Sequence, residues 1–260
     1  MITFKFSRKA NGVPVLSKSN IEDIAKVILN DYNPNLLEEP SALDVEHLLE
    51  CYAGLEVDYK NLTHNRSILG MIVFNDGYVP VYDKENNKAE RLPVEEGTVL
   101  IDNSLLEDDQ IRRGRFTVCH EVAHWFLHRD QYIVDKNQLN LFDSIPGETK
   151  TAIKCRSTDI ESNYRKELVT DDDWMEWQAD YLASALLMPE EQFIKVYQNY
   201  VELLGLEDQY EEMVVLADTN IYVDGVMKYV AEIFDVSLAS ARIRLKNLGL
   251  IKDNRQESII

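Results

Sequence analysis

The stretch FTVCHEVAHWFLH, residues 116–128, restricts what this chain can fold into, because it places ionisable groups on an apolar helix. It contains the pattern H-E-x-x-H at His120, Glu121 and His124, and three of the chain's five histidines. Apart from His124, the residues from 122 to 127 are apolar, so the predicted helix is hydrophobic almost all round and should be buried. Buried imidazoles and carboxylates need partners, since unpaired polar groups are costly inside a protein.

The spacing of these residues predicts a zinc site. Residues four apart lie on one face of a helix, so His120 and His124 can each give one nitrogen to the same ion at roughly 2.0–2.1 Å. Glu121 would then point toward the open coordination position. The alternative, a surface helix with charged neighbours, is disfavoured by the apolar flanks. His128 lies about 12 Å along a straight helix from His120 and cannot reach that ion, so a structural or substrate-facing role is predicted for it.

A later helical stretch, WMEWQADYLASALLMP at residues 174–189, supplies the remaining carboxylates. Glu176 and Asp180 are four residues apart among aromatic and aliphatic neighbours, which argues against two solvated acids on an amphipathic helix. Glu176 is predicted to complete a site of two histidines and one glutamate. Asp180 is predicted to accept a hydrogen bond from the outer nitrogen of a ligand histidine and so to fix its tautomer.

Together, RFTVCHEVAHWFLHR and WMEWQADYLASALLMP resemble the ImmA/IrrE family of bacterial metallopeptidases, whose hallmarks are an H-E-x-x-H helix and a later E-x-x-A-[ND]-x-x-A-x-x-L-L-M-P helix. The resemblance extends more weakly over most of residues 20–252. It implies an α+β fold with a reduced, zincin-like core of the gluzincin type. That core has N-terminal helices, a small antiparallel sheet and the two motif helices, with a small helical unit at the C-terminus.

The same resemblance implies His120, His124 and Glu176 as zinc ligands and Glu121 as the general base. It also implies an endopeptidase that cuts a specific protein, such as a phage-type or stress-response repressor with a helix-turn-helix domain. Two departures from the family pattern stand out. About fifty residues separate His124 from Glu176, which predicts a lid-like insertion at residues 130–172. Cys119 stands where alanine is common, and a packing role is predicted for it, with a redox-sensitive role as the alternative.

The spacing of apolar residues predicts the other elements. Helices are expected at residues 19–31, with Ser19 and Glu22 as a capping box, at residues 44–54 and from about 109 to 129. Strands are expected within residues 55–62, 67–74 and 97–105, with NDGY at residues 75–78 as a hairpin turn. The helices after Pro189 lead to a domain division into residues 1–205, the peptidase, and residues 206–260, a helical segment.

The composition favours a protein of the reducing cytoplasm. A formal net charge of −19 makes nucleic acid and anionic lipid poor partners, and the three cysteines are too widely spaced for a disulfide framework. No apolar run is long enough to span a membrane, and the N-terminus lacks an apolar signal segment.

Two other functions remain open at this point. The chain could keep the metal as a structural staple and bind a repressor or toxin without cutting it. It could also bind DNA through residues 226–252, where apolar and small residues have helix-turn-helix spacing and four side chains are basic: Arg242, Arg244, Lys246 and Lys252. Asp235 stands where such a turn usually has glycine, and the overall charge opposes DNA binding. The metal in the cell, zinc or manganese, is also open, although two imidazoles and one carboxylate favour zinc.

Overall fold

The computed structural model has a mixed α+β fold, as predicted, and divides into two compact units. The sheet unit consists of Met1–Ile21 and Asp44–Ala183, and the helical unit of Glu22–Leu43 and Ser184–Ile260. The residues that the structure describes are 2–10, 12–132, 152–156, 168–205, 215–218 and 220–252. Two of the three unit boundaries fall inside helices and none falls at residue 205. The assignment of a peptidase domain to residues 1–205 and of a separate segment to residues 206–260 remains a prediction.

A four-stranded sheet forms the centre of the sheet unit. Its order is β1 (Glu56–Lys60), β5 (Thr98–Asp102), β2 (Ile68–Val73) and β6 (Ala152–Arg156). Strand β2 is antiparallel to both of its neighbours, but β1 pairs with β5 in parallel. The expectation of a purely antiparallel sheet is therefore wrong. Strands β1 and β5 are joined by a long connection, which permits parallel pairing, whereas a tight hairpin joins only antiparallel strands.

Strands β3 (Gly77–Asp83) and β4 (Lys88–Val94) form a separate two-stranded hairpin. The predicted turn at residues 75–78 is wrong, because β2 and β3 belong to different sheets. The turn lies between β3 and β4, where the Asp83 carboxylate accepts hydrogen bonds from the backbone N–H groups of Glu85 and Asn86, and Asn87 adopts a positive φ of 51°. Asparagine tolerates that conformation better than most residues.

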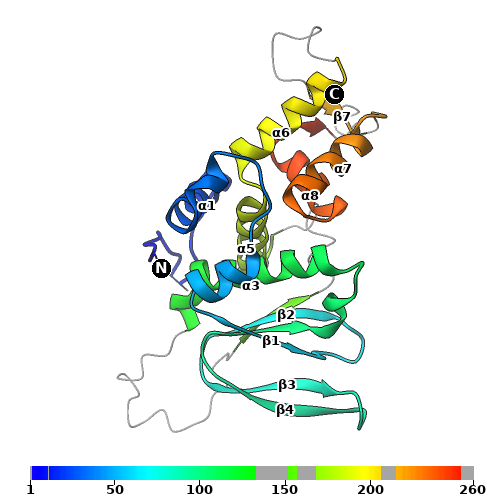
Figure 1. The fold of residues 1–260 in the computed structure, drawn as a ribbon. Helices are drawn as coiled ribbons and strands as arrows, with labels where there is room; N and C mark the ends of the chain where they lie inside the picture. The colour runs from blue at the N-terminus through cyan, green and yellow to red at the C-terminus, as the bar shows by residue number, and fades with distance from the viewer. Residues whose placement is uncertain are drawn as a thin grey trace. The chain divides into compact units, whose positions relative to one another are not determined.

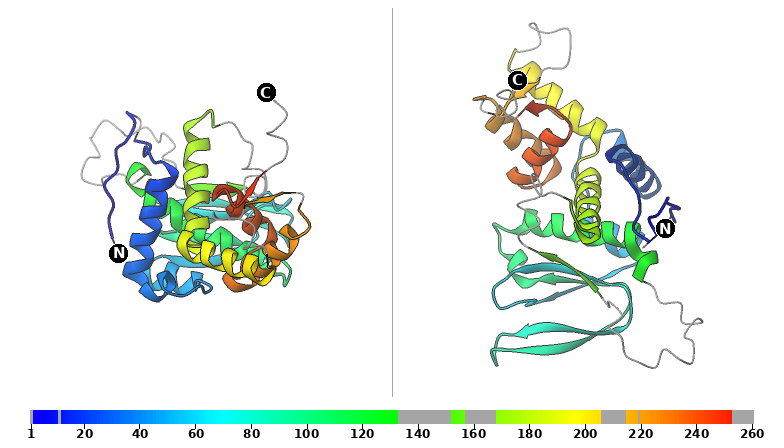
Figure 2. Two further views of the ribbon diagram at one scale, coloured as in Figure 1. Left: turned by 90° about the horizontal axis from the view of Figure 1, so that it is seen from above. Right: turned by 180° about the vertical axis from the view of Figure 1, so that it is seen from behind.

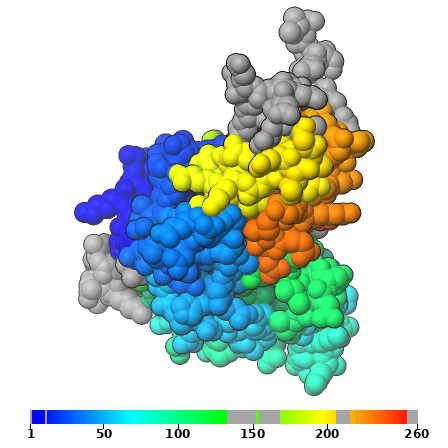
Figure 3. Space-filling view, turned by 45° about the horizontal axis from the view of Figure 1, so that its top comes forward, coloured from blue at the N-terminus to red at the C-terminus, as the bar shows by residue number. Residues whose placement is uncertain are grey.

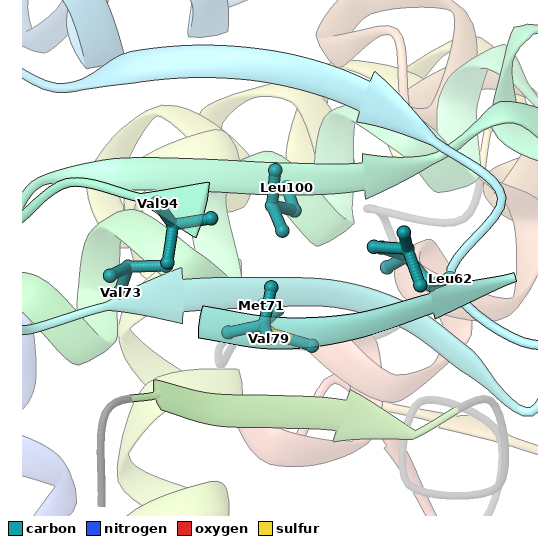
Figure 4. Packing of buried hydrophobic residues seen from close by; sticks show 7 residues of the cluster. Leu62, Met71, Val73, Val79, Val94 and Leu100 are labelled. Carbon is teal, nitrogen blue, oxygen red and sulfur yellow. The ribbon is translucent and has the colours of Figure 1, made fainter. Parts of the chain in front are cut away.

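The hairpin covers one face of the four-stranded sheet (Figures 1 and 2). Figure 4 shows the apolar cluster between them, to which the sheet and its flanking residues contribute Leu62, Met71, Val73 and Leu100, and the hairpin contributes Val79, Val81 and Val94. Because successive side chains of a strand point to opposite faces, residues 70 and 72 of β2 face the other way.

That other face is covered by α3 (Ile111–Tyr132), which lies along it in Figure 1 and contacts both β2 and β5. From Phe116 to His128 all but one of its residues are buried. The prediction of a buried helix from about 109 to 129 is confirmed. The buried stretch places the H-E-x-x-H residues directly against the sheet.

Helix α1 (Lys18–Tyr32) has a different cap from the one predicted. The Ser17 hydroxyl oxygen accepts from the Asn20 N–H at 3.2 Å, and the Asn20 side chain accepts from the Ser17 N–H at 3.0 Å. Ser17 and Asn20 therefore form the reciprocal cap, and Glu22 has another partner, described below. The next predicted helix consists of α2 (Val45–His47) followed by a π-helical turn, η2 (Leu48–Tyr52), and short 3-10 turns span Pro34–Leu37 (η1) and Asn103–Leu106 (η3).

Helix α5 (Asp171–Leu187) carries the second motif and begins with three aspartates, as predicted from their preference for a helix N-terminus. Most of residues 130–172 lie outside the described part of the chain, and so does the proposed lid. The described residues of this segment include the last turn of α3 and β6, which is the fourth strand of the sheet.

In the helical unit, α6 (Glu190–Leu203) lies beside α7 (Val223–Phe234), as Figure 3 shows in yellow and orange. Helix α8 (Leu238–Asn247) follows a short joint, and β7 (Leu216–Ala217) pairs in parallel with β8 (Ile251–Lys252). At the joint, Asp235 ends α7 in the left-handed conformation, φ 50° and ψ 55°, and Ser237 caps α8. Asp235 thus adopts the backbone conformation that glycine usually supplies there.

The side chain of Arg244 is fully buried in this unit. Its guanidinium donates two hydrogen bonds to the Glu22 carboxylate, at 2.6 and 2.9 Å, and one to the Met188 carbonyl oxygen at 3.0 Å. Among the described residues, no helix is long and apolar enough to cross a membrane.

Candidate metal centre

Two helices place the candidate ligands. On α3, His120, Glu121 and His124 are fully buried, because almost every other residue of this part of the helix packs into the core of the sheet unit. On α5, Glu176 has a side chain that is 16% exposed, and Asp180 follows one turn later. The site is therefore buried on the α3 side and reaches solvent beside Glu176.

The Nε2 atoms of His120 and His124 lie 3.0 Å apart. One carboxylate oxygen of Glu176 lies 3.3 Å from His120 Nε2, and the other lies 3.6 Å from His124 Nε2. One ligand atom from each of the three residues lies within 4.8 Å of the others, and the three form the single possible metal cluster among the described residues. Residues 50 or more positions apart in the sequence thus converge as the motif spacing predicted.

Asp180 lies behind His120. Its Oδ1 is 2.8 Å from His120 Nδ1, in a buried hydrogen bond. Because a carboxylate can only accept, His120 Nδ1 carries the proton and His120 Nε2 presents its lone pair to Glu176 and His124. This is the geometry expected of Asp180 from the sequence, and its effect on a bound metal remains a prediction.

His128 lies behind His124. The two Nδ1 atoms are 2.9 Å apart, and His128 Nε2 is 3.0 Å from Oε1 of Gln178 on α5. His128 is fully buried, and burial together with the neighbouring His124 lowers its pKa to about 3. It is therefore neutral at ordinary pH, and the substrate-facing alternative for His128 is wrong.

The three ligand atoms fit a metal ion. With bonds of roughly 2.0–2.1 Å, ligand atoms around a tetrahedral Zn²⁺ lie about 3.3–3.4 Å apart. The two histidine nitrogens lie 3.0 Å apart, and the Glu176 oxygen nearest to each lies at 3.3 Å and 3.6 Å, so all three separations are close to that value. Two imidazole nitrogens and one carboxylate oxygen are a donor set that zinc accepts readily. The buried Oε2 of Glu176 has no hydrogen-bond partner among the described residues, as expected of an atom whose partner is a metal ion.

Glu176 is ionised in this setting. Burial by itself would raise the pKa of its carboxyl group, but the two imidazole rings beside it, His124 first, hold that pKa below its usual value. An anionic third ligand offsets part of the charge of a divalent cation.

Glu121 lies near enough to His120 and Glu176 to interact with both electrostatically, and its one backbone neighbour of note is the N–H of Ile72. Neither of its carboxylate oxygens makes a hydrogen bond of ordinary geometry to any described residue, and both are buried. Burial raises the pKa of Glu121 to about 8, which the neighbouring His120 and the backbone N–H of Ile72 only partly offset. A buried carboxyl group with no salt bridge and no hydrogen bond of ordinary geometry is costly to a fold and is a common mark of a functional group.

The strand above Glu121 makes room for it. A Cβ atom added at Gly70 of β2 would lie 2.5 Å from Glu121 Oε1 and 2.6 Å from Thr117 Cγ2. The approach of this carboxylate to β2 therefore depends on glycine at position 70.

Sequence reasoning did not identify Gly70 or Gln178 as part of this centre. Gly70 lies within an otherwise ordinary apolar strand, and Gln178 lies between Glu176 and Asp180. Their roles depend on contacts across 51 and 50 residues of sequence, to Glu121 and His128 respectively. The contact between His128 and His124 could have been predicted, because His128 lies one helical turn after His124 on the same face.

Comparison with known proteins gives one family. Residues 156–246 match the model of the IrrE N-terminal-like domain, peptidase family M78, and this interval contains Glu176, Asp180 and Gln178. The helix with His120 and His124 lies outside the matched interval. No curated protein matches the chain.

Proposed function

We propose that this chain, which belongs to the ImmA/IrrE family of metallopeptidases, is an intracellular zinc-dependent endopeptidase with a specific protein substrate. Zinc is proposed from the donor set of His120, His124 and Glu176, the cluster that could hold a metal ion. The observation that carries catalysis is the carboxylate of Glu121, which is buried near that cluster without a salt bridge or a hydrogen bond of ordinary geometry. A metal site that served only as a structural staple would gain nothing from such a group, which costs stability.

The proposed reaction is peptide hydrolysis. A zinc ion held by the three ligands would supply a Lewis acid for the scissile carbonyl and the attacking water. Glu121 accepts one proton from the attacking water while the oxygen of that water bonds to the carbonyl carbon. It then delivers the proton to the amide nitrogen as the carbon–nitrogen bond breaks. His120 and His124 are held in place by Asp180 and His128, so the ligands need little rearrangement during the reaction.

The environment of Glu121 suits a general base. Burial raises its pKa toward neutral pH, whereas a dication beside it favours the charged form, and a base works best when its pKa lies near the operating pH. We propose a helix-turn-helix repressor as the substrate, on the strength of the family resemblance described from the sequence. The high negative charge suits a basic region of such a partner.

Two alternatives remain to be tested. A metal-stapled protein that binds a repressor or toxin without cutting it would use the same three ligands. DNA binding through residues 226–252 is less well supported, since Arg242 and Lys246 both pair with Asp218, at 2.7 and 2.9 Å, and Arg244 is buried against Glu22. Their charges are largely offset within the helical unit, and a mobility-shift assay at several salt concentrations would detect any DNA binding that remains.

The metal site can be tested without a substrate. The purified protein should hold close to one Zn²⁺ per chain, and His120→Ala or His124→Ala should lose it. Glu176→Gln should weaken binding strongly, whereas Asp180→Asn should keep zinc with about 10–100-fold lower affinity. Full zinc occupancy in both histidine variants would overturn the site. Loss of metal from Asp180→Asn but not from Glu176→Gln would exchange the proposed roles of the two carboxylates.

Catalysis is tested by Glu121→Gln. This change keeps the shape of the side chain but removes its ability to take a proton. The zinc-loaded variant should still bind a repressor encoded by an adjoining reading frame, while cleavage falls by about 10²–10⁴-fold. Cleavage followed by gel electrophoresis and mass spectrometry gives the rate and the cut site. Equal cleavage by the two proteins would exclude this mechanism, and tight binding without cleavage by either would favour the metal-stapled alternative.

A further inference from the structure

The second histidine ligand, His124, is backed by a chain of hydrogen bonds that has no charged member. The chain runs from His124 Nδ1 to His128 Nδ1 at 2.9 Å, from His128 Nε2 to Gln178 Oε1 at 3.0 Å, and from Gln178 Nε2 to the Pro14 carbonyl oxygen at 2.8 Å. All three hydrogen bonds are buried. His120, by contrast, is backed by the Asp180 carboxylate.

The direction of every hydrogen bond in this chain follows from its far end. The backbone carbonyl of Pro14 can only accept, so it fixes the amide of Gln178 with its NH₂ group toward Pro14 and its oxygen toward His128. That oxygen accepts from His128, which therefore carries its proton on Nε2. His128 is fully buried and its hydrogen-bond partners are an imidazole and an amide, not a carboxylate, so a second proton on its ring would be a buried unpaired charge. Its Nδ1 atom is therefore an acceptor, and His124 donates to it from its own Nδ1. The lone pair of His124 Nε2 is left facing His120 and Glu176.

We propose that His128, oriented by Gln178 and the Pro14 carbonyl, is a positioning residue that holds His124 in the tautomer able to bind the metal. The proposal rests on the proposed metal site and extends it to the N-terminal segment. Without an acceptor behind it, His124 could place its proton on Nε2 and turn its ring, and both changes oppose ligation. Residues that orient a ligand histidine in this way typically contribute 10–100-fold to metal affinity.

The chain offers a matched control in a second glutamine. Gln131 at the end of α3 donates to the Gly12 carbonyl oxygen at 3.0 Å, so it also holds the N-terminal segment, but no described hydrogen bond links it to a histidine. Gln131→Met and Gln178→Met each remove one contact to that segment. Only Gln178→Met also removes the acceptor for His128.

Affinity is measured with Zn²⁺ alone, by competition with a chromophoric chelator on the full chain. His128→Leu and Gln178→Met should lower zinc affinity about 10–100-fold. His128→Gln, which keeps an acceptor for His124, should restore most of it, and Gln131→Met should match the wild type. Wild-type affinity in His128→Leu would overturn the proposal, and so would equal losses in the two glutamine variants.

A second measurement needs no variant and no activity. Two-bond ¹H–¹⁵N spectra of the zinc-loaded wild-type protein should show His128 protonated at Nε2 and not at Nδ1, and His120 and His124 protonated at Nδ1. A His128 ring protonated at Nδ1 could not accept from His124 and would overturn the proposal even if the variants failed to fold. If the protein bound no zinc, the proposed function would fail, whereas the His128 tautomer in the metal-free protein would still test the hydrogen-bond chain.

Discussion

At the scale of single residues, two positions near the candidate metal centre affect it through packing. Because Gly70 has no side chain, the Glu121 carboxylate can lie against β2. Cys119, on the same helix, is fully buried. Neither residue is proposed to be catalytic, and a separate prediction can be made for each.

Gly70→Ala should impair catalysis through Glu121. The added methyl group would lie 2.5 Å from Glu121 Oε1, so the carboxylate or the strand must shift, at a cost of about 1–3 kcal/mol in the free energy of unfolding. Zinc affinity should change less than threefold by chelator competition, while cleavage falls by more than about tenfold. Adding Gly70→Ala to Glu121→Gln should cause little further loss, since both changes remove the same group. Fully additive losses would place the effect of Gly70 elsewhere.

Cys119 should be an inert packing residue. Burial raises the pKa of its thiol to about 12, so almost no thiolate forms at pH 8. In a chain carrying Cys51→Ser and Cys155→Ser, iodoacetamide should leave native Cys119 unmodified and should label it after denaturation, as read by mass spectrometry. Labelling of the native protein within minutes would instead support the redox-sensitive alternative.

At the scale of elements, buried polar contacts join helices that are distant in the sequence. The pair formed by Arg244 of α8 and Glu22 of α1 is the strongest example in the helical unit, because both side chains are buried and the contact is bidentate. The pair between Lys26 of α1 and Glu191 of α6, at 2.8 Å, is a useful contrast, with side chains 40% and 71% exposed.

Removing one member of the buried pair should be costly. Glu22→Gln or Arg244→Met should lower the free energy of unfolding by about 3–5 kcal/mol in urea, because a charge or a set of donors is left buried without its partner. The double variant should lose less than the sum of the two. Lys26→Met should cost at most about 1 kcal/mol, since that pair is solvated. Similar losses at the two sites would show that burial does not strengthen the first pair.

At the scale of the whole molecule, metal binding and folding are linked. The candidate ligands come from two helices that meet only in the folded chain, so a metal ion bound by them would stabilise the native state by mass action. The net charge of −19 complicates this, because an acidic surface can also hold divalent ions weakly.

Zinc removal should therefore lower thermal stability in a way that depends on the site. At a free zinc concentration of about 100 times the dissociation constant, binding should add about 2.7 kcal/mol. For a chain of this size, that corresponds to roughly 5–10 °C in the thermal midpoint, lost again on chelation. The His120→Ala variant should show no such shift in scanning calorimetry. An equal shift in that variant would mean that the ion acts at the acidic surface.

The sequence by itself predicted the two motif helices of this protein and the candidate ligands of its metal centre. Residues four apart share a helix face. The pairing of His120 with His124, and of Glu176 with Asp180, could therefore be predicted from the sequence. The structure brings the first three of these residues into one cluster, and places Asp180 against His120. The three aspartates that begin α5 and the joint before α8 could also be predicted, because such preferences act within a few residues, whereas the cap of α1 was predicted two residues too late.

Only the tertiary structure decided how distant segments pair. Three pairings could not be predicted, because the local sequence of each segment does not indicate which distant segment it contacts. They are the parallel pairing of β1 with β5, the separate hairpin of β3 and β4, and the ion pair of Glu22 with Arg244. The same holds for the chain from Pro14 through Gln178 and His128 to His124, whose members span 164 positions of sequence. A hydrogen bond depends on distance and direction within a few tenths of an ångström, and for residues far apart in the chain packing alone sets both.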